Sequence, residues 1–322
     1  MLSTARLLTV CSWVAGLAPA MQLDRGALVP VYRQALEERE KQFGPDHPKV
    51  ARSASDLGLY LRNIGNRSAA AEYLARAVEI DARTLSASSK LFAEDLENLA
   101  SVSPPEQALE LHRKAAACDD PEVSARNWGK VGDLSAASGD TNAALQAYRH
   151  ALSKEEAASG AAHPRVAVRL NDLAQVVDPK AAEPMVRRAL AIETKALGLS
   201  NPATGVTMSN LANVLLGLGK LTEAEARARQ ALKILESTLG GNHPRVGTVT
   251  SNLAAILREK PDLAGARRYY ARALAIDESV YGPDHPEVAV DLRNLAEVLD
   301  AMGRKQEAKR LVERAAGING GR

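Results

Sequence analysis

The stretch GPDHPEVAVDLRNLA, residues 282–296, carries two marks that recur along the chain. Its tripeptide Asn-Leu-Ala, at residues 294–296, is found again at 252–254 and at 210–212, at intervals of 42 residues. His or Asn followed by Pro stands ten residues before each marker leucine. Two marks that keep a fixed distance through successive copies indicate an internal repeat, and the fold must be built from that repeated unit.

A second mark, Ala-Leu or a close variant, recurs eight times between residues 35–36 and 315–316, at intervals of 36 to 42 residues. Apolar residues favour positions −7, −3, 0, +1, +3 and +4 around the marker leucine, which is helical spacing. Near +8 a glycine often follows, where a chain that leaves a helix can adopt positive φ. These glycines are Gly65, Gly139, Gly219 and Gly303. Each unit is therefore predicted to be a helix-turn-helix hairpin.

A lone hairpin cannot cover its apolar face, so neighbouring hairpins must stack. The sequence predicts an all-α protein, a right-handed superhelical solenoid of about seven helix pairs plus a leading helix over residues 21–322. Aromatic residues make up only 3% of the chain, which disfavours an all-β fold. Shorter helices and a local change in superhelical curvature are expected around 103–105 and 178–179, where proline tightens the turn, with Trp128 filling space nearby.

The segments Gly282–Ala289, Arg272–Ile276 and Gly44–Pro48, with Ala182-Glu183-Pro184, resemble the tetratricopeptide repeats (TPR) of the kinesin light chain type. The resemblance extends over roughly residues 26–317. It implies a stand-alone array of the kind common in bacteria, because the heptad coiled coil of the motor subunit is not found before residue 26. It says little about function, because such arrays bind many unrelated partners.

Residues 1–20 are predicted to be a cleaved signal peptide or, alternatively, a degenerate first helix. Arg6 precedes an apolar run from Leu7 to Leu17, and Ala18-Pro19-Ala20 has the form of a cleavage site. In the repeat register Pro19 would fall inside a helix, where proline is strongly unfavourable. The signal peptide predicts an exported or periplasmic protein, and the degenerate helix a cytoplasmic one.

Composition and motifs exclude several classes of function. The 41 basic and 39 acidic residues are interleaved, which disfavours a nucleic-acid partner. No apolar run is long enough for membrane insertion of the mature chain. Cys11 and Cys118 form no CxxC pair, and Cys118 is expected to be buried. No enzyme motif and no cofactor or metal site is predicted. The four repeat histidines are expected to cap helices: His47, His163, His243 and His285.

Polar residues of the first helices supply the candidate binding site. Positions −5, −2, −1 and +2 point away from the apolar face, towards an inner, concave surface. The predicted peptide-binding residues there are Asn98, Asn171, Gln175, Asn210, Asn213, Asn252, Arg293 and Asn294. Carboxamides can pair with the backbone of an extended peptide. The resemblance points in particular to Asn210, Asn252 and Asn294, since matching asparagines line the cargo groove in that family.

Two alternative roles are open for these asparagines: simple solvation, or hydrogen bonding between neighbouring helices that fixes the stacking. Asp56, Lys130 and Asp172 interrupt any ladder of amides. Arg52, Arg126 and Arg293 favour an acidic partner.

The sequence thus predicts a non-enzymatic scaffold that binds a peptide or protein segment on its concave face. The alternative is a self-associating architectural element that uses its ends and convex face. The sequence leaves the oligomeric state open.

Overall fold

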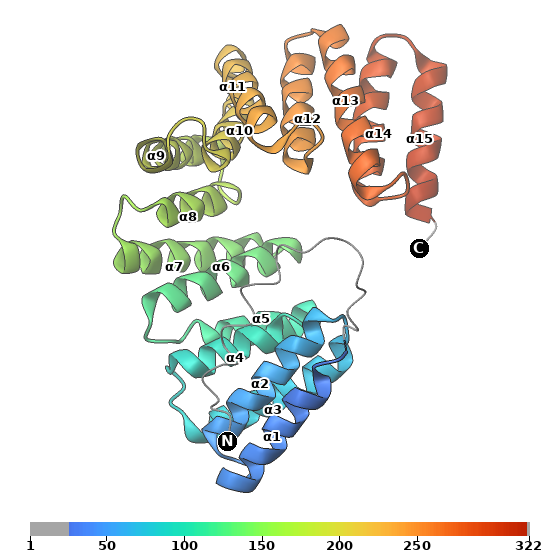
Figure 1. Ribbon diagram of the computed structural model, residues 1–322. Coiled ribbons are helices and arrows are strands. Elements are labelled where there is room, and N and C mark those ends of the chain that lie inside the picture. The colour runs from blue at the N-terminus through green and yellow to red at the C-terminus, as the bar shows by residue number, and fades with distance from the viewer. Residues whose placement is uncertain (1–25, 321–322) are drawn as a thin grey trace. The chain divides into compact units, whose positions relative to one another are not determined.

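The computed structural model describes residues 26–320 (Figure 1). Within them the chain forms α-helices joined by short turns. The helices are α1 Val29–Phe43, α2 Pro48–Asn63, α3 Arg67–Thr84, α4 Lys90–Ala100, α5 Pro105–Ala115, α6 Pro121–Ala137, α7 Thr141–Ser159, α8 Pro164–Ala174, α9 Pro179–Leu197, α10 Pro202–Gly217, α11 Leu221–Leu239, α12 Pro244–Glu259, α13 Leu263–Tyr281, α14 Pro286–Ala301 and α15 Lys305–Gly320. After α1 they follow one another along the chain in the order of the predicted helix pairs, from α2–α3 to α14–α15. The predicted signal peptide, residues 1–20, lies outside the described residues.

The helices belong to two compact units. The smaller unit contains α1, α2, α3 and most of α4, and the larger unit contains residues 87–93 and α5 to α15. In each pair the even-numbered helix is the first helix and the odd-numbered helix is the second. In the larger unit, Figure 1 shows the pairs α12–α13 and α14–α15 standing side by side. The all-α repeat fold expected from the two sequence marks is confirmed.

The His-Pro mark starts the first helix of most pairs. His243 is the N-cap of α12, and its side chain accepts a hydrogen bond from the backbone N–H of Arg245. Pro244 occupies the first turn, where its missing N–H would have no helical partner. Asn201 and Pro202 start α10 in the same way. The predicted capping role of all four repeat histidines is confirmed.

The glycines near +8 end the first helices. Gly219 has φ 71° and follows α10, and the next residue, Lys220, donates its N–H to the carbonyl of Leu215. The turns at Gly65, Gly139 and Gly303 are closed in the same way. In each, the N–H of the residue after the glycine donates to the carbonyl of the residue five positions before that donor. A left-handed residue at this place lets orphan carbonyls of the last turn find donors.

Two of the pairs are shortened, as expected. Helices α4, α5 and α8 each have 11 residues, whereas α10, α12 and α14 each have 16. A proline starts the second helix in both shortened pairs, at Pro105 and Pro179. The change of curvature expected there stays a prediction. Trp128 lies half-buried in α6 and stacks on His150, with ring centroids 4.7 Å apart.

Small side chains form the contact surface of the second helices. Ala224, Ala228 and Ala231 of α11 are fully buried, and leucines and valines of α10 and α12 cover them. One apolar cluster extends in this way from the end of α8 to α15. Alanines allow helices to approach closely, so each pair contributes a layer to a continuous core. Cys118 is buried, as expected.

Among the described helices, none combines the length and apolar character needed to cross a membrane.

Candidate binding face

Two neighbouring first helices of the larger unit, α10 and α12, lie close together. Cα atoms of α10 and α12 approach within 8 Å, and short side chains bridge neighbouring first helices. Long side chains bridge the second helices α9 and α11, where Nη2 of Arg187 lies 2.9 Å from Oε1 of Glu223. We therefore call the surface formed by α6, α8, α10, α12 and α14 the inner face.

Three predicted asparagines connect the first helices of the inner face. The amide of Asn252 donates to the hydroxyl of Ser209 (3.1 Å). The amide of Asn210 donates to the carbonyl oxygen of Asn171 (3.3 Å), and the amide of Asn171 donates to the hydroxyl of Thr207 (2.7 Å). All three asparagines are half-buried. These bonds run between α8, α10 and α12, so they hold neighbouring repeats in register.

The smaller unit has a similar bridge. Asn98 of α4 donates to the hydroxyl of Ser55 in α2 (3.3 Å). That hydroxyl in turn donates to the buried carboxylate of Asp95 (2.5 Å). The amide of Asn98 also approaches the same carboxylate oxygen, at 3.5 Å. Asn98 therefore takes part in stacking α4 on α2.

The remaining predicted residues are more accessible. Gln175, Asn213 and Arg293 are exposed, and Asn294 is half-buried. The first two stand at position +2, one helical turn beyond the bridging asparagines. The predicted set thus divides into residues that join repeats and residues that face solvent beside them. Peptide binding stays a prediction for both groups.

Four of the predicted residues line one pocket of about 250 Å³ between α8, α9 and α10. Asn171, Gln175, Asn210 and Asn213 supply its polar groups. Apolar side chains supply the rest of the lining: Ala174, Val177, Pro179, Ala182, Val186 and Val214. An apolar pocket with a few convergent polar groups is the usual form of a ligand site.

The pocket exists because α8 is short. Helix α8 ends at Ala174, whereas α10 continues to Gly217, and Pro179 packs against the end of α10. A Cβ at position 217 would lie 2.9 Å from Cγ of Pro179, so glycine permits this close approach. Ala182 and Val186 of α9 form the floor of the pocket and are themselves at most 1% exposed. The sequence indicated the short turn, but it gave no sign of this apolar lining.

Ion pairs neutralise much of the charge on the first helices. Lys130 and Asp133 of α6 are 3.1 Å apart, and Arg169 and Asp172 of α8 are 2.9 Å apart. Burial raises the pKa of Asp172, and the guanidinium of Arg169 opposes this shift. In the smaller unit, Arg52 lies 3.7 Å from Asp56. The preference for an acidic partner stays a prediction, and of the three arginines on which it depends, Arg52 already faces a carboxylate.

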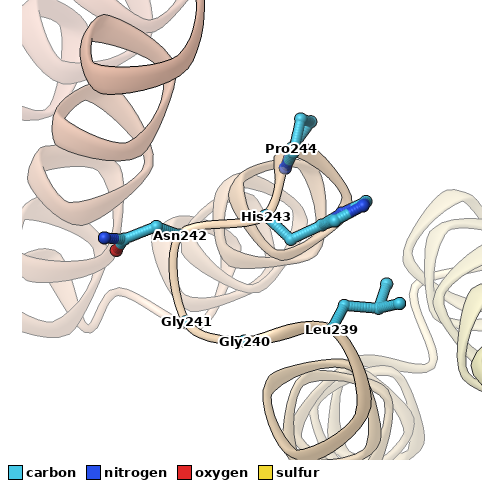
Figure 2. Close-up of a pocket in the computed structure, with 6 residues that line it drawn as sticks. All are labelled: Leu239, Gly240, Gly241, Asn242, His243 and Pro244. Carbon is cyan, nitrogen blue, oxygen red and sulfur yellow. The ribbon is translucent and has the colours of Figure 1, made fainter. Parts of the chain in front are cut away.

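The loop between α11 and α12 forms an open hollow of its own. Figure 2 shows its lining, Leu239–Pro244, with the His243 ring and the Leu239 side chain extending to the same side and Asn242 pointing away from both. These six residues are consecutive and belong to one turn. His243 is already used as the N-cap of α12, so the hollow brings together no groups from separate elements. Nowhere in residues 26–320 do three or more His, Cys, Asp or Glu side chains form a group that could hold a metal ion.

Comparison with known proteins identifies the repeat. The tetratricopeptide repeat profile matches residues 29–83, 178–237, 203–278 and 245–319, which together span more than half of the chain. The chain belongs to the tetratricopeptide repeat family. This TPR fold is generally a non-catalytic scaffold that binds protein partners. A search of curated proteins returned no match.

Solved TPR structures confirm the resemblance to kinesin light chain repeats. A kinesin light chain from Podosopora anserina with nearly identical TPR-like repeats is 20% identical, with a TM-score of 0.51, over 62% of this chain and 97% of that one. BtubC (BKLC) from P. vanneervenii is 24% identical, with a TM-score of 0.54, over 70% of this chain and 91% of that one. The apo form of RapI is 13% identical, with a TM-score of 0.66, over 84% of this chain and 97% of that one. At these identities the likeness concerns the fold.

Proposed function

We propose that this TPR protein is a non-enzymatic scaffold whose inner face binds an extended peptide or protein segment. The pocket between α8, α9 and α10 is its anchoring point. The observation that carries the proposal is that this pocket gathers four of the eight predicted side chains around an apolar lining. The lining accommodates one apolar side chain of the partner, and the carboxamides pair with the partner's backbone on either side of it.

No catalytic step is part of this proposal. The polar groups of the pocket are carboxamides, which neither exchange protons nor act as nucleophiles near neutral pH. Neither a cofactor nor a nucleic acid enters the proposal, and the proposed partner is protein alone. An acidic stretch in that partner would suit the exposed Arg293 and Arg126, which lie on other first helices of the inner face.

The test uses the two exposed amides, because they can be removed without breaking a bridge between repeats. We expect the double variant Gln175→Ala, Asn213→Ala to lose about ten-fold or more of its affinity for peptides selected on the wild-type protein from a phage-displayed random library, since each lost amide leaves a peptide group unpaired. The melting temperature should stay within about 2 °C of the wild type, because both side chains are exposed and Gln175, the C-cap of α8, makes its cap bonds through its backbone N–H.

The matched control is Asn142→Ala, Gln146→Ala. These side chains are also exposed amides, but they lie on α7, a second helix. The control should bind the selected peptides as the wild type does. If the inner-face variant retains full affinity, or if the library yields no binder to the wild-type protein, the pocket is not the anchoring point.

Self-association is the second candidate, and one observation favours it. Val312 of α15 is 51% exposed, whereas its counterparts Val186, Ala228 and Tyr270 are at most 2% exposed beneath the following first helix. Val312 also lines a hollow of about 630 Å³ with Ala296 and Ala308. A second copy could pack there. Sedimentation velocity decides the matter: a concentration-dependent oligomer that Val312→Glu abolishes, and that Gln175→Ala leaves intact, would favour this alternative.

A further inference from the structure

The contacts between successive pairs repeat one arrangement. At five of the junctions between successive pairs, a residue near the end of the second helix faces a residue of the next first helix that stands 14 positions later in the sequence. In the larger unit, Glu155 lies 3.9 Å from Arg169, and Glu193 lies beside Thr207. The same two positions at the junction of α11 and α12 hold Leu235 and Val249, which are buried in one apolar cluster.

Two junctions place a carboxyl group at both positions. Asp81 of α3 is hydrogen-bonded to Asp95 of α4, and Asp277 of α13 is hydrogen-bonded to Asp291 of α14. Asp81, Asp95 and Asp291 are at most 5% exposed. A carboxylate only accepts hydrogen bonds, so a bond between two carboxyl groups requires that one of them keeps its proton. The other three junctions contain no such requirement.

In the smaller unit the proton belongs to Asp81. Oδ1 of Asp95 already accepts hydrogen bonds from Ser55 (2.5 Å) and Asn98 (3.5 Å), so Asp95 serves as the acceptor in this network. The other charged groups that act on this network are Arg52 and Asp56 of α2, with Arg39 of α1 acting on Asp56. Asp81 is left as the donor.

In the larger unit Asp291 is the donor to Asp277. Oδ1 of Asp277 and Oδ2 of Asp291 are buried and have no hydrogen-bond partner among the described residues. Gly247 of α12 covers the pair, since a Cβ there would lie 2.6 Å from Oδ1 of Asp277. The charged or titratable groups that act on the pair are Glu287 of α14, which disfavours a second negative charge, and His285 at its N-cap. Among the described residues, no arginine or lysine is paired with Asp277 or Asp291 as Arg169 is with Glu155.

We propose that these two carboxyl pairs are proton-dependent clasps, which hold α3 to α4 and α13 to α14 while one proton is shared and loosen those junctions when it is lost. Burial raises the pKa of Asp81 to about 7 and that of Asp291 to about 7. Loss of the proton places two negative charges side by side at a buried contact, where the desolvation of the second charge is uncompensated.

The direction of the pH effect follows from these shifts. The folded pKa lies above that of an aspartate in the unfolded chain, so the folded state binds more protons between those two values. The clasp therefore contributes its full stability below the pKa of an aspartate in the unfolded chain, about 4, and loses it progressively as the pH rises through about 7. The junction of α11 and α12, with Leu235 and Val249, should not respond.

The test is hydrogen exchange of the full chain at about pH 5.5 and about pH 8, corrected for the intrinsic rate, together with thermal unfolding. We expect amide protection in α13 and α14 to fall roughly ten-fold or more at the higher pH, while protection in α11 and α12 is unchanged. The melting temperature should fall by roughly 4 to 8 °C.

Asp291→Asn isolates the cause, because an amide donates to Asp277 without needing a proton. This variant should match the wild type at about pH 5.5 and lose the fall in protection of α13 and α14 at about pH 8. Asp300→Asn, which removes an exposed carboxylate from the same helix, is the control and should behave as the wild type. Should the Asn variant unfold, Asp277→Leu with Asp291→Val copies the pair found between α11 and α12. A pH-dependent loss of protection that persists in a folded variant, or its absence in the wild type, overturns the proposal.

Discussion

The pairs α10–α11 and α12–α13 are the same size and differ at three points. Their helices have 16 and 19 residues in both cases. They differ in the N-cap of the first helix, which is Asn201 or His243. They also differ at the second position after that helix, which is Gly219 or Pro261. They also differ in the contact made with the next pair, which is apolar after α11 and formed by two carboxyl groups after α13. One backbone thus tolerates different chemistry at each of its joints.

The largest expected effect concerns the apolar contact between α11 and α12. Leu235→Ala should lower the free energy of unfolding by about 3 kcal/mol, because Leu235 is fully buried and its removal leaves a cavity against α12. Urea unfolding followed by circular dichroism measures this loss. Leu199→Ala is the control: Leu199 is 57% exposed, and its replacement should cost less than about 1 kcal/mol. Equal losses would show that the α11–α12 joint is not held by apolar packing.

The second difference lies in the turns. Pro261 has φ 28°, although the proline ring favours about −65°. Asp262 nevertheless donates to the carbonyl of Leu257, as Lys220 does to Leu215 in the neighbouring pair. Pro261 therefore occupies a turn that suits glycine. We expect Pro261→Gly to raise the free energy of unfolding by about 1 to 2 kcal/mol, the relief of strain less the added chain entropy of glycine.

The converse change is Gly219→Pro, which should destabilise the α10–α11 pair. Thermal unfolding of both variants checks the prediction, and a lower melting temperature for Pro261→Gly would contradict it.

The smallest effect concerns the caps. His243→Ala should cost about 1 kcal/mol, because the N–H of Arg245 loses its acceptor at 3.1 Å. His243→Asn should be nearly neutral, since Asn201 makes the same bond in α10 at 2.9 Å. Chemical denaturation of the two variants gives the difference directly. A large loss for the Asn variant would mean that the imidazole does more than cap the helix.

The sequence predicted the elements that depend on local signals. Pro244 and Gly219 are local marks, and the helix begins or ends beside them as their backbone preferences require. The apolar register was also predicted: Val288, Leu292 and Leu295 of the last first helix are all buried. These features repeat, so each copy supports the others.

What the sequence did not predict depends on contacts between distant residues. In the sequence, Asp291 is one more polar position of an amphipathic helix, and only the structure shows its contact with Asp277. The pocket needs both the early end of α8 at Ala174 and the approach of Pro179 to Gly217, and neither follows from helical periodicity. For the asparagines the sequence left stacking and binding open. The structure places hydrogen bonds between repeats at Asn98, Asn171, Asn210 and Asn252.

The relay from Asn210 through Asn171 to Thr207 has a further consequence. A partner that takes an amide hydrogen from Asn171 competes with a bond that already joins α8 to α10, so occupancy exchanges internal bonds for external ones. Partner binding and the spacing of α8 and α10 are then coupled. A tightly bound partner would relax the spacing between these two neighbouring hairpins, and a change in that spacing would alter the affinity for the partner.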